Sequence, residues 1–128
     1  MATLKRINVV FLYVLDISKA RKFYEAAFDF GKPVVDAKWW VEYAAGDGSH
    51  LALHQIDAEH AKRAGLGAGA VKFSFEVDDI QHFTDKLKKL GATFRYEPRL
   101  EYGFWLAEFE DTEGNALRLY QKAKKPAK

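Results

Sequence analysis

The side chains of this chain that are best equipped for chemistry are its histidines. His50 and His54 are separated by an even number of positions, so they share one face if residues 50–55 form a strand. Two imidazoles on one face would act as a metal pair or as a general base. The alternative is a pair of partly exposed polar residues at the strand ends, and His54 is the better functional candidate. His60 and His82 lie on helical stretches, and we expect them at the surface.

Aromatic residues are the second chemical feature, with 10 Phe, 6 Tyr and 3 Trp. In a strand, the adjacent Trp39 and Trp40 face opposite ways, so at most one of them enters a common site directly. The functional interpretation is a stacking surface for a flat or cationic organic ligand. The alternative is ordinary core and dimer interface, where Trp and Tyr are also enriched. The residues in question are Trp39, Trp40, Tyr43, Tyr96, Tyr102, Phe104 and Trp105.

Length and composition limit the function classes. The chain has 128 residues, no cysteine, and a formal net charge of +2 from 20 basic and 18 acidic side chains. The absence of cysteine excludes disulfides, thiolate metal sites and cysteine nucleophiles. The balanced charge argues against nucleic-acid binding, and no apolar run approaches the roughly 20 residues of a membrane span. Without a signal-peptide pattern at the start, we expect a cytoplasmic protein that binds neither nucleic acid nor membrane.

Hydropathy patterns predict the elements that position these residues. Strands are expected over residues 7–14, 34–35, 39–45 and 50–55, and again over 71–77, 92–96, 104–109 and 116–121. Helices are expected after Asp16 and after Asp79, whose carboxylates can cap them. Pro98 and Gly103 should bracket a loop, of which residues 99–103 would cover the mouth of a site.

The order of elements repeats. A shift of 63 residues places Asp16 on Asp79 and Ile17 on Ile80, and each half contains a strand, a helix and three strands. We therefore predict an α+β fold in which two tandem βαβββ modules form a curved mixed sheet around a shared cleft. Module one would span about residues 5–56, a linker 57–70 and module two 71–121, which together make one domain over residues 1–121. Residues 122–128 would be a basic, disordered tail.

Three motifs in this order resemble the vicinal oxygen chelate superfamily, which includes glyoxalase I, bleomycin-resistance proteins and extradiol dioxygenases. They are VLDISKARKFY at residues 14–24, FEVDDI at residues 75–80 and EDTEGN at residues 110–115. The last motif departs from the family's Asp-Pro-Asp-Gly-Asn turn, because Thr112 stands in place of the proline. The resemblance covers about residues 5–121 and implies the fold more strongly than any reaction.

Enzymes of this superfamily hold a divalent metal with His, Gln or Glu on four strands. By resemblance, the four ligand positions here correspond to Val9, Ala52, Lys72 and Arg118. Valine and alanine carry no donor atom, and lysine and arginine place positive charge where the cation would lie. We therefore expect no metal site and no cofactor.

Strand alternation indicates which residues would line the cleft. Lys72 and Arg118 could clamp an anion, or they could pair internally with Glu76 or Glu108, which is the commoner fate of buried charges. The expected ligand-binding residues are Phe11, Tyr13, Trp39, Trp40, His54, Lys72, Glu76, Tyr102, Trp105 and Arg118.

These observations predict a metal-free small-molecule binding protein of the glyoxalase/bleomycin-resistance type. It would sequester an organic ligand between aromatic walls. The resemblance to the superfamily, whose members commonly form dimers, implies a homodimer in which the cleft lies within one chain or across the interface. A second hypothesis is a glyoxalase-like lyase, isomerase or dioxygenase that uses His50, His54 and Glu76 with a relocated metal or by acid–base catalysis alone. A third is a non-catalytic dimeric interaction module whose aromatic residues are buried between chains.

Overall fold

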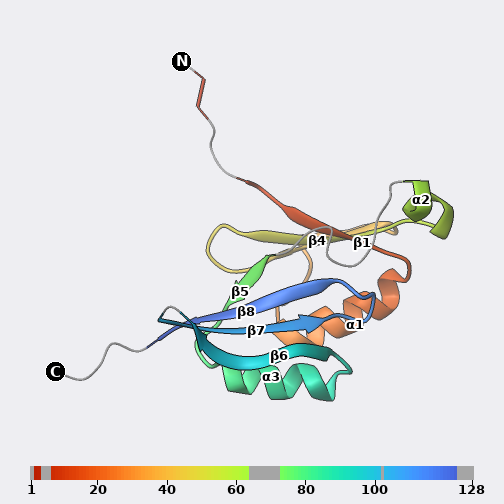
Figure 1. Cartoon of the computed structure of the whole chain (residues 1–128). Helices are drawn as coiled ribbons and strands as arrows, with labels where there is room; N and C mark the ends of the chain where they lie inside the picture. Colours follow the sequence, from red (N-terminus) through yellow and green to blue (C-terminus); the bar gives the residue numbers. More distant parts are fainter. Residues whose placement is uncertain (1, 4–6, 64–72, 102, 124–128) are drawn as a thin grey trace. The chain divides into compact units, whose positions relative to one another are not determined.

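The structure is a computed structural model that describes residues 2–3, 7–63, 73–101 and 103–123. Two compact units make up the chain, Met1–Gly65 and Leu66–Lys128. The first contains β1 (Val10–Val14), α1 (Ile17–Phe28), β2 (Val35–Asp36), β3 (Trp40–Ala44), β4 (His50–Gln55) and α2 (Ala58–Arg63) (Figure 1). The second contains β5 (Ser74–Glu76), α3 (Ile80–Lys89), β6 (Thr93–Glu101), β7 (Phe104–Glu110) and β8 (Ala116–Lys122).

Both units have the same strand order. The sheet of module one runs β1-β4-β3-β2, and the sheet of module two runs β5-β8-β7-β6. In each sheet the first strand pairs in parallel with the last strand of its module, and the remaining pairs are antiparallel. The predicted α+β fold of two βαβββ modules is therefore confirmed as two four-stranded mixed sheets. The shared cleft stays a prediction.

In both modules, the same kinds of side chain cap the helix that follows the first strand. The carboxylate of Asp16 accepts a hydrogen bond from the backbone N–H of Lys19 at 3.1 Å, and Asp79 caps α3 in the same way. The side chain of Gln55 accepts from the N–H of Ile17 at 2.9 Å. Gln121, at the equivalent place on β8, accepts from the N–H of Ile80 at 2.7 Å. These side chains satisfy helix N–H groups that have no partner within the helix.

One face of the sheet in module one packs on α1 and forms its core. Alternate residues of β1, Leu12 and Val14, are 3% and 1% exposed, as expected for the face turned toward the helix. Residues on the opposite face of β1 are partly or well exposed, among them Phe11 at 39%. This second face, which the helix does not cover, is the open face of the sheet.

The structure corrects the predicted loop after residue 96. β6 continues through Pro98 as far as Glu101, so residues 99–101 belong to a strand and not to a loop over a site. Proline is tolerated because β6 is the edge strand of its sheet, where the missing N–H leaves no partner unpaired, and because the register shifts between Tyr96 and Arg99. The sequence also placed Lys122 in the tail, whereas it ends β8.

In the part of the chain that the structure describes, no helix has the length and apolar character needed to cross a membrane.

Candidate functional site

Four rings gather on the open face of module one. We call this set of residues, Phe11, Tyr13, Trp40 and His54, the aromatic face. The ring centroid of Phe11 lies 5.2 Å from that of Trp40 and 5.5 Å from that of Tyr13, and the imidazole of His54 lies 5.4 Å from Tyr13 and 5.6 Å from Trp40. The ring of His60, on α2, adds a further contact 6.0 Å from Tyr13. Such spacings are those of interacting aromatic pairs.

Strand register explains why these rings meet. In the parallel pair β1–β4, Tyr13 lies opposite His54, and in the antiparallel pair β3–β4, Trp40 lies opposite the same residue. Phe11 lies two positions before Tyr13 and therefore shares its face. Three strands thus place large rings side by side, although the residues come from positions 11 to 54 of the sequence.

A carboxylate joins the aromatic face to His50. Glu42 accepts a hydrogen bond from the indole Nε1 of Trp40 at 3.0 Å, and its second oxygen lies 2.6 Å from Nδ1 of His50. The hydrogen bond with His50, followed by that with Trp40, lowers the pKa of Glu42 below its usual range against the opposing effect of desolvation. Because an ionised carboxylate only accepts hydrogen bonds, Nδ1 of His50 carries the proton. One acidic side chain therefore fixes both the indole ring and the tautomer of the imidazole.

Glu42 is not among the site residues predicted from the sequence. The signal that would have found it is the hairpin turn at residues 46–49, which fixes the pairing of β3 with β4. In this register Ala44 lies opposite His50 and Glu42 lies opposite Ala52, so Glu42 and His50 are diagonal neighbours on one face. Because Ala52 has a short side chain, the carboxylate of Glu42 can reach past it to both rings.

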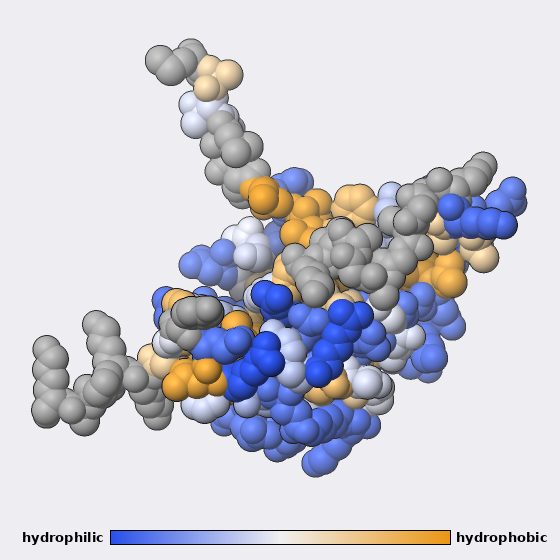
Figure 2. Space-filling view, in the orientation of Figure 1, coloured by the Kyte–Doolittle hydropathy of each residue, from blue (hydrophilic) through white to orange (hydrophobic). Residues whose placement is uncertain are grey.

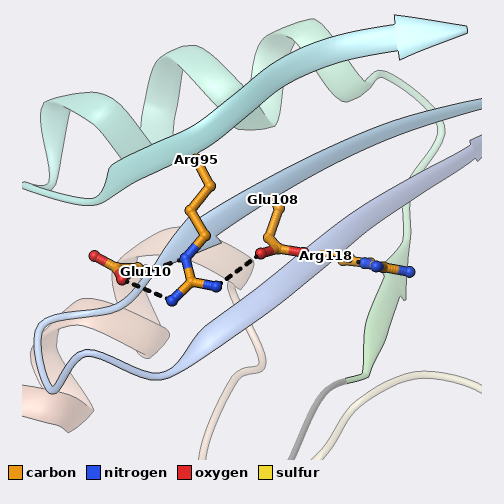
Figure 3. Close-up of polar contacts among 4 residues, drawn as sticks. All are labelled: Arg95, Glu108, Glu110 and Arg118. Atoms are coloured by element: carbon orange, nitrogen blue, oxygen red, sulfur yellow. Dashed lines mark hydrogen bonds and ion pairs between the residues drawn. The ribbon is translucent and has the colours of Figure 1, made fainter. Parts of the chain in front are cut away.

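The open face of module two has a different chemistry. Glu108, only 4% exposed, lies between Nη1 of Arg95 and Nε of Arg118, each at 3.2 Å from one of its oxygens. Arg95 also binds Glu110 at 3.1 Å. This hydrogen bond is the main cause that raises the pKa of Arg95 above its usual value. Figure 3 shows Arg95 between the two glutamates and the guanidinium of Arg118 on the far side of Glu108. Of the two partners predicted for Arg118, it pairs with Glu108.

Three other predicted ligand residues lie outside the aromatic face. Trp39 is 52% exposed and carries Lys38 over its ring, with Nζ 4.9 Å from the centroid. Trp105 alternates with Phe104 and Leu106, so it lies on the opposite face of β7 from theirs. Glu76 is exposed at the end of β5.

Lys72 and Tyr102 lie outside the described residues.

Four positions hold the metal in enzymes of the superfamily, and the structure describes three of them in this chain. The residues at these three positions do not fit a metal ion. Val9 and Ala52 have no donor atom, and the guanidinium of Arg118 is a cation already paired with Glu108. Within residues 2–3, 7–63, 73–101 and 103–123, no three His, Asp or Glu side chains are grouped so that they could hold a metal.

Exposed apolar side chains accompany the aromatic face. Figure 2 shows hydrophobic surface around the beginning of β1. Ile7, which precedes this strand, is 77% exposed, and Phe11, within it, is 39% exposed. An exposed apolar patch of this kind usually marks a site of ligand or protein contact.

Comparison with known proteins identifies relatives over nearly the whole chain. The profile of the Glyoxalase/Bleomycin resistance protein/Dioxygenase superfamily matches residues 6–119. The Bacillus subtilis (strain 168) protein YurT, described as uncharacterized, is 32% identical in a 127-residue alignment that covers 91% of this chain and 99% of YurT.

Two solved structures show the same fold. A glyoxalase/bleomycin resistance protein/dioxygenase family enzyme from Burkholderia phytofirmans PsJN has a TM-score of 0.76 at 18% identity, with 90% of this chain and 97% of that chain covered. TnmS3, an antibiotic binding protein from Streptomyces sp. CB03234, has a TM-score of 0.75 at 20% identity, with 96% of this chain and 100% of that chain covered.

Proposed function

The chain belongs to the glyoxalase/bleomycin resistance protein/dioxygenase superfamily, and we propose that it is a metal-free protein that binds and sequesters a flat organic molecule. The observation that carries the proposal is the aromatic face, in which four rings with centroid spacings of 5.2 to 6.1 Å line one side of the sheet of module one. A ligand lying on this face would bury apolar surface and stack on Phe11 and Trp40.

The chemistry of the family's ligand positions supports binding without a metal. Ala52 offers no donor, and Arg118 places a cation beside Glu108, where it neutralises a nearly buried carboxylate. The similarity to TnmS3, which is described as an antibiotic binding protein, supports a role in binding rather than turnover. Ligand capture of this type requires a preformed apolar surface with a few polar groups, which is what module one offers.

The experiment that tests the proposal compares two exposed phenylalanines. Phe11 is 39% exposed and lies 5.2 Å from the ring of Trp40, whereas Phe104, in module two, is 41% exposed and lies 5.2 Å from the ring of Tyr120. Chelator-treated protein is titrated with planar probes built on naphthalene, indole and anthraquinone while tryptophan emission and the melting temperature are followed. We expect saturable quenching and a raised Tm that Phe11→Ala removes and Phe104→Ala leaves in place.

Either of two results would contradict the proposal. The first is equal loss of binding in both variants, which would mean that the aromatic face is not the site. The second is a saturable rise in Tm with Zn, Ni, Co, Mn or Fe(II) ions that disappears when His50 and His54 are changed to alanine. That result would favour the metal-dependent lyase or dioxygenase instead.

A further inference from the structure

The proposed ligand surface has one polar partner whose geometry indicates more than stacking. His50 is held by Glu42 at 2.6 Å through Nδ1, and the same carboxylate holds Trp40 of the aromatic face at 3.0 Å. A ligand that stacks on Trp40 therefore lies beside the imidazole that shares a carboxylate with the indole.

The second ring nitrogen of His50, Nε2, is the atom that can accept a hydrogen bond from a ligand. Because Nδ1 of His50 carries its proton and donates a hydrogen bond to Glu42, Nε2 of the neutral ring carries a lone pair. Nε2 has no hydrogen-bond partner among the residues that the structure describes, and the side chain of His50 is 34% exposed. An imidazole whose Nδ1–H is bound to a carboxylate is a stronger acceptor at Nε2, because the carboxylate stabilises the imidazolium that a second proton would create.

We propose that module one recognises aromatic ligands that carry an acidic hydroxyl group, a phenol or an equivalent, with Nε2 of His50 as the acceptor of the O–H. This inference rests on the proposed function and narrows its ligand class. In the bound state the O–H hydrogen bonds to Nε2. For an acidic phenol the O–H bond breaks, its proton binds to Nε2 and its electron pair stays on the phenolate oxygen. The resulting imidazolium is then paired with the ionised Glu42.

The imidazoles of the other two histidines of module one, His54 and His60, are not held by a carboxylate among the described residues. The imidazole of His54 contacts only rings, at 5.4 to 6.1 Å between centroids, and has no carboxylate partner among the described residues. His60 likewise contacts the ring of Tyr13. A carboxylate-bound imidazole next to a stacking surface therefore occurs at His50.

The test uses two compounds that differ only at the group in question, 4-nitrophenol and its methyl ether 4-nitroanisole. Their rings stack alike, but the ether has no proton to donate. We expect the phenol to bind about tenfold more tightly than the ether, the factor given by one net hydrogen bond to a charge-supported acceptor. We also expect the absorption band of the phenolate to appear on binding, at a pH at which free 4-nitrophenol is mostly un-ionised.

Variants separate this inference from the proposed function. His50→Gln should abolish the phenolate band, because the amide of glutamine can accept a hydrogen bond but cannot take up the proton of the phenol. Glu42→Gln should weaken the phenolate band and the preference for the phenol. His82→Gln, which changes a histidine on α3 of module two, should leave both as in the unaltered protein, and unliganded melting curves establish that each variant is folded. Equal affinity of the unaltered protein for the two compounds, or a phenolate band that survives His50→Gln, overturns the inference while the proposed function stands. If neither compound binds, the proposed function fails for planar aromatic ligands, and the inference fails with it.

Discussion

We expect the interaction of Glu42 with His50 to contribute a measurable coupling to the free energy of unfolding. Replacing Glu42 with glutamine keeps an oxygen for the indole of Trp40 but removes the negative charge opposite Nδ1 of His50. Replacing His50 with alanine removes the other partner. The two single variants and the double variant form a thermodynamic cycle, and the non-additive part of the free energy of unfolding measures the coupling of the two side chains.

The expected magnitude follows from the geometry and the exposure of the pair. A hydrogen bond to a charged group contributes about 1.5–3 kcal/mol when well protected from solvent, whereas exposed ion pairs contribute about 0.2–1 kcal/mol. The contact is short, at 2.6 Å, and the two side chains are 34% and 17% exposed. The pair is therefore intermediate, and we expect a coupling of about 1–2 kcal/mol at pH 7, discounted from the buried range for solvent screening.

Urea unfolding followed by far-UV circular dichroism measures this coupling. With an m-value of about 2 kcal/mol/M, a coupling of about 1.5 kcal/mol displaces the unfolding midpoint by about 0.7 M from the additive position. A second cycle between Glu42→Gln and His60→Ala is the control. In the part of the chain that the structure describes, His60 contacts the ring of Tyr13 and makes no hydrogen bond or ion pair with Glu42, so its coupling should fall below about 0.5 kcal/mol. A coupling below about 0.5 kcal/mol between Glu42 and His50 would refute the reasoning on the fixed imidazole.

The pH dependence of the same pair has a definite sign. The pKa of Glu42 is lowered in the folded protein from its ordinary value of 4.5, chiefly by the hydrogen bond with His50. A group with a lowered folded pKa stabilises the protein above its unfolded pKa, and this stabilisation is lost as the pH falls through the folded value. The stability difference between the unaltered protein and Glu42→Gln should therefore shrink below about pH 4.5. A difference that grows in that range would contradict this sign.

Four further substitutions test contacts within the two modules by thermal or urea unfolding. Asp16→Ala and Asp79→Ala should each destabilise by about 1 kcal/mol, since each removes one helix cap, and very unequal losses would contradict their equivalence. Tyr43→Phe should cost about 1–2 kcal/mol because the fully buried Tyr43 donates to Glu25 at 2.6 Å, and an unchanged midpoint would contradict the importance of that bond. Glu108→Leu should cost about 3 kcal/mol or less, because the two guanidiniums it leaves are about 40% exposed; a larger loss would mean that they are effectively buried.

The fold could be predicted from the sequence because its signals are local. Asp16 and Asp79 precede apolar residues at helical spacing, and the strand over residues 50–55 appears where the alternation of the sequence placed it. The prediction was wrong at Pro98, because a proline is acceptable there through the position of β6 at the sheet edge and the register shift beside it. Local sequence does not determine which strand becomes an edge.

The site could be predicted only in part, because it depends on pairing between strands. Alternation correctly placed Phe11 and Tyr13 on the face opposite the helix. The partner of Arg118 was left open between two glutamates, and Glu42 was missed, because both depend on the register of an antiparallel pair. A register that differs by one residue would exchange the faces of every side chain on the strand.

The duplication itself separates the residues that build the fold from those that set the chemistry. Asp16 and Gln55 of module one and their counterparts in module two perform the same task at the junction of strand and helix. The open faces share one element, a glutamate opposite the central strand, at Glu42 facing Ala52 and at Glu108 facing Arg118. In module two the arginine neutralises that glutamate directly across the strands. In module one the alanine has no charge to offer, and the glutamate binds Trp40 and His50. A glutamate at the equivalent position therefore takes part in an ion pair with arginine in module two and holds an imidazole and an indole in module one.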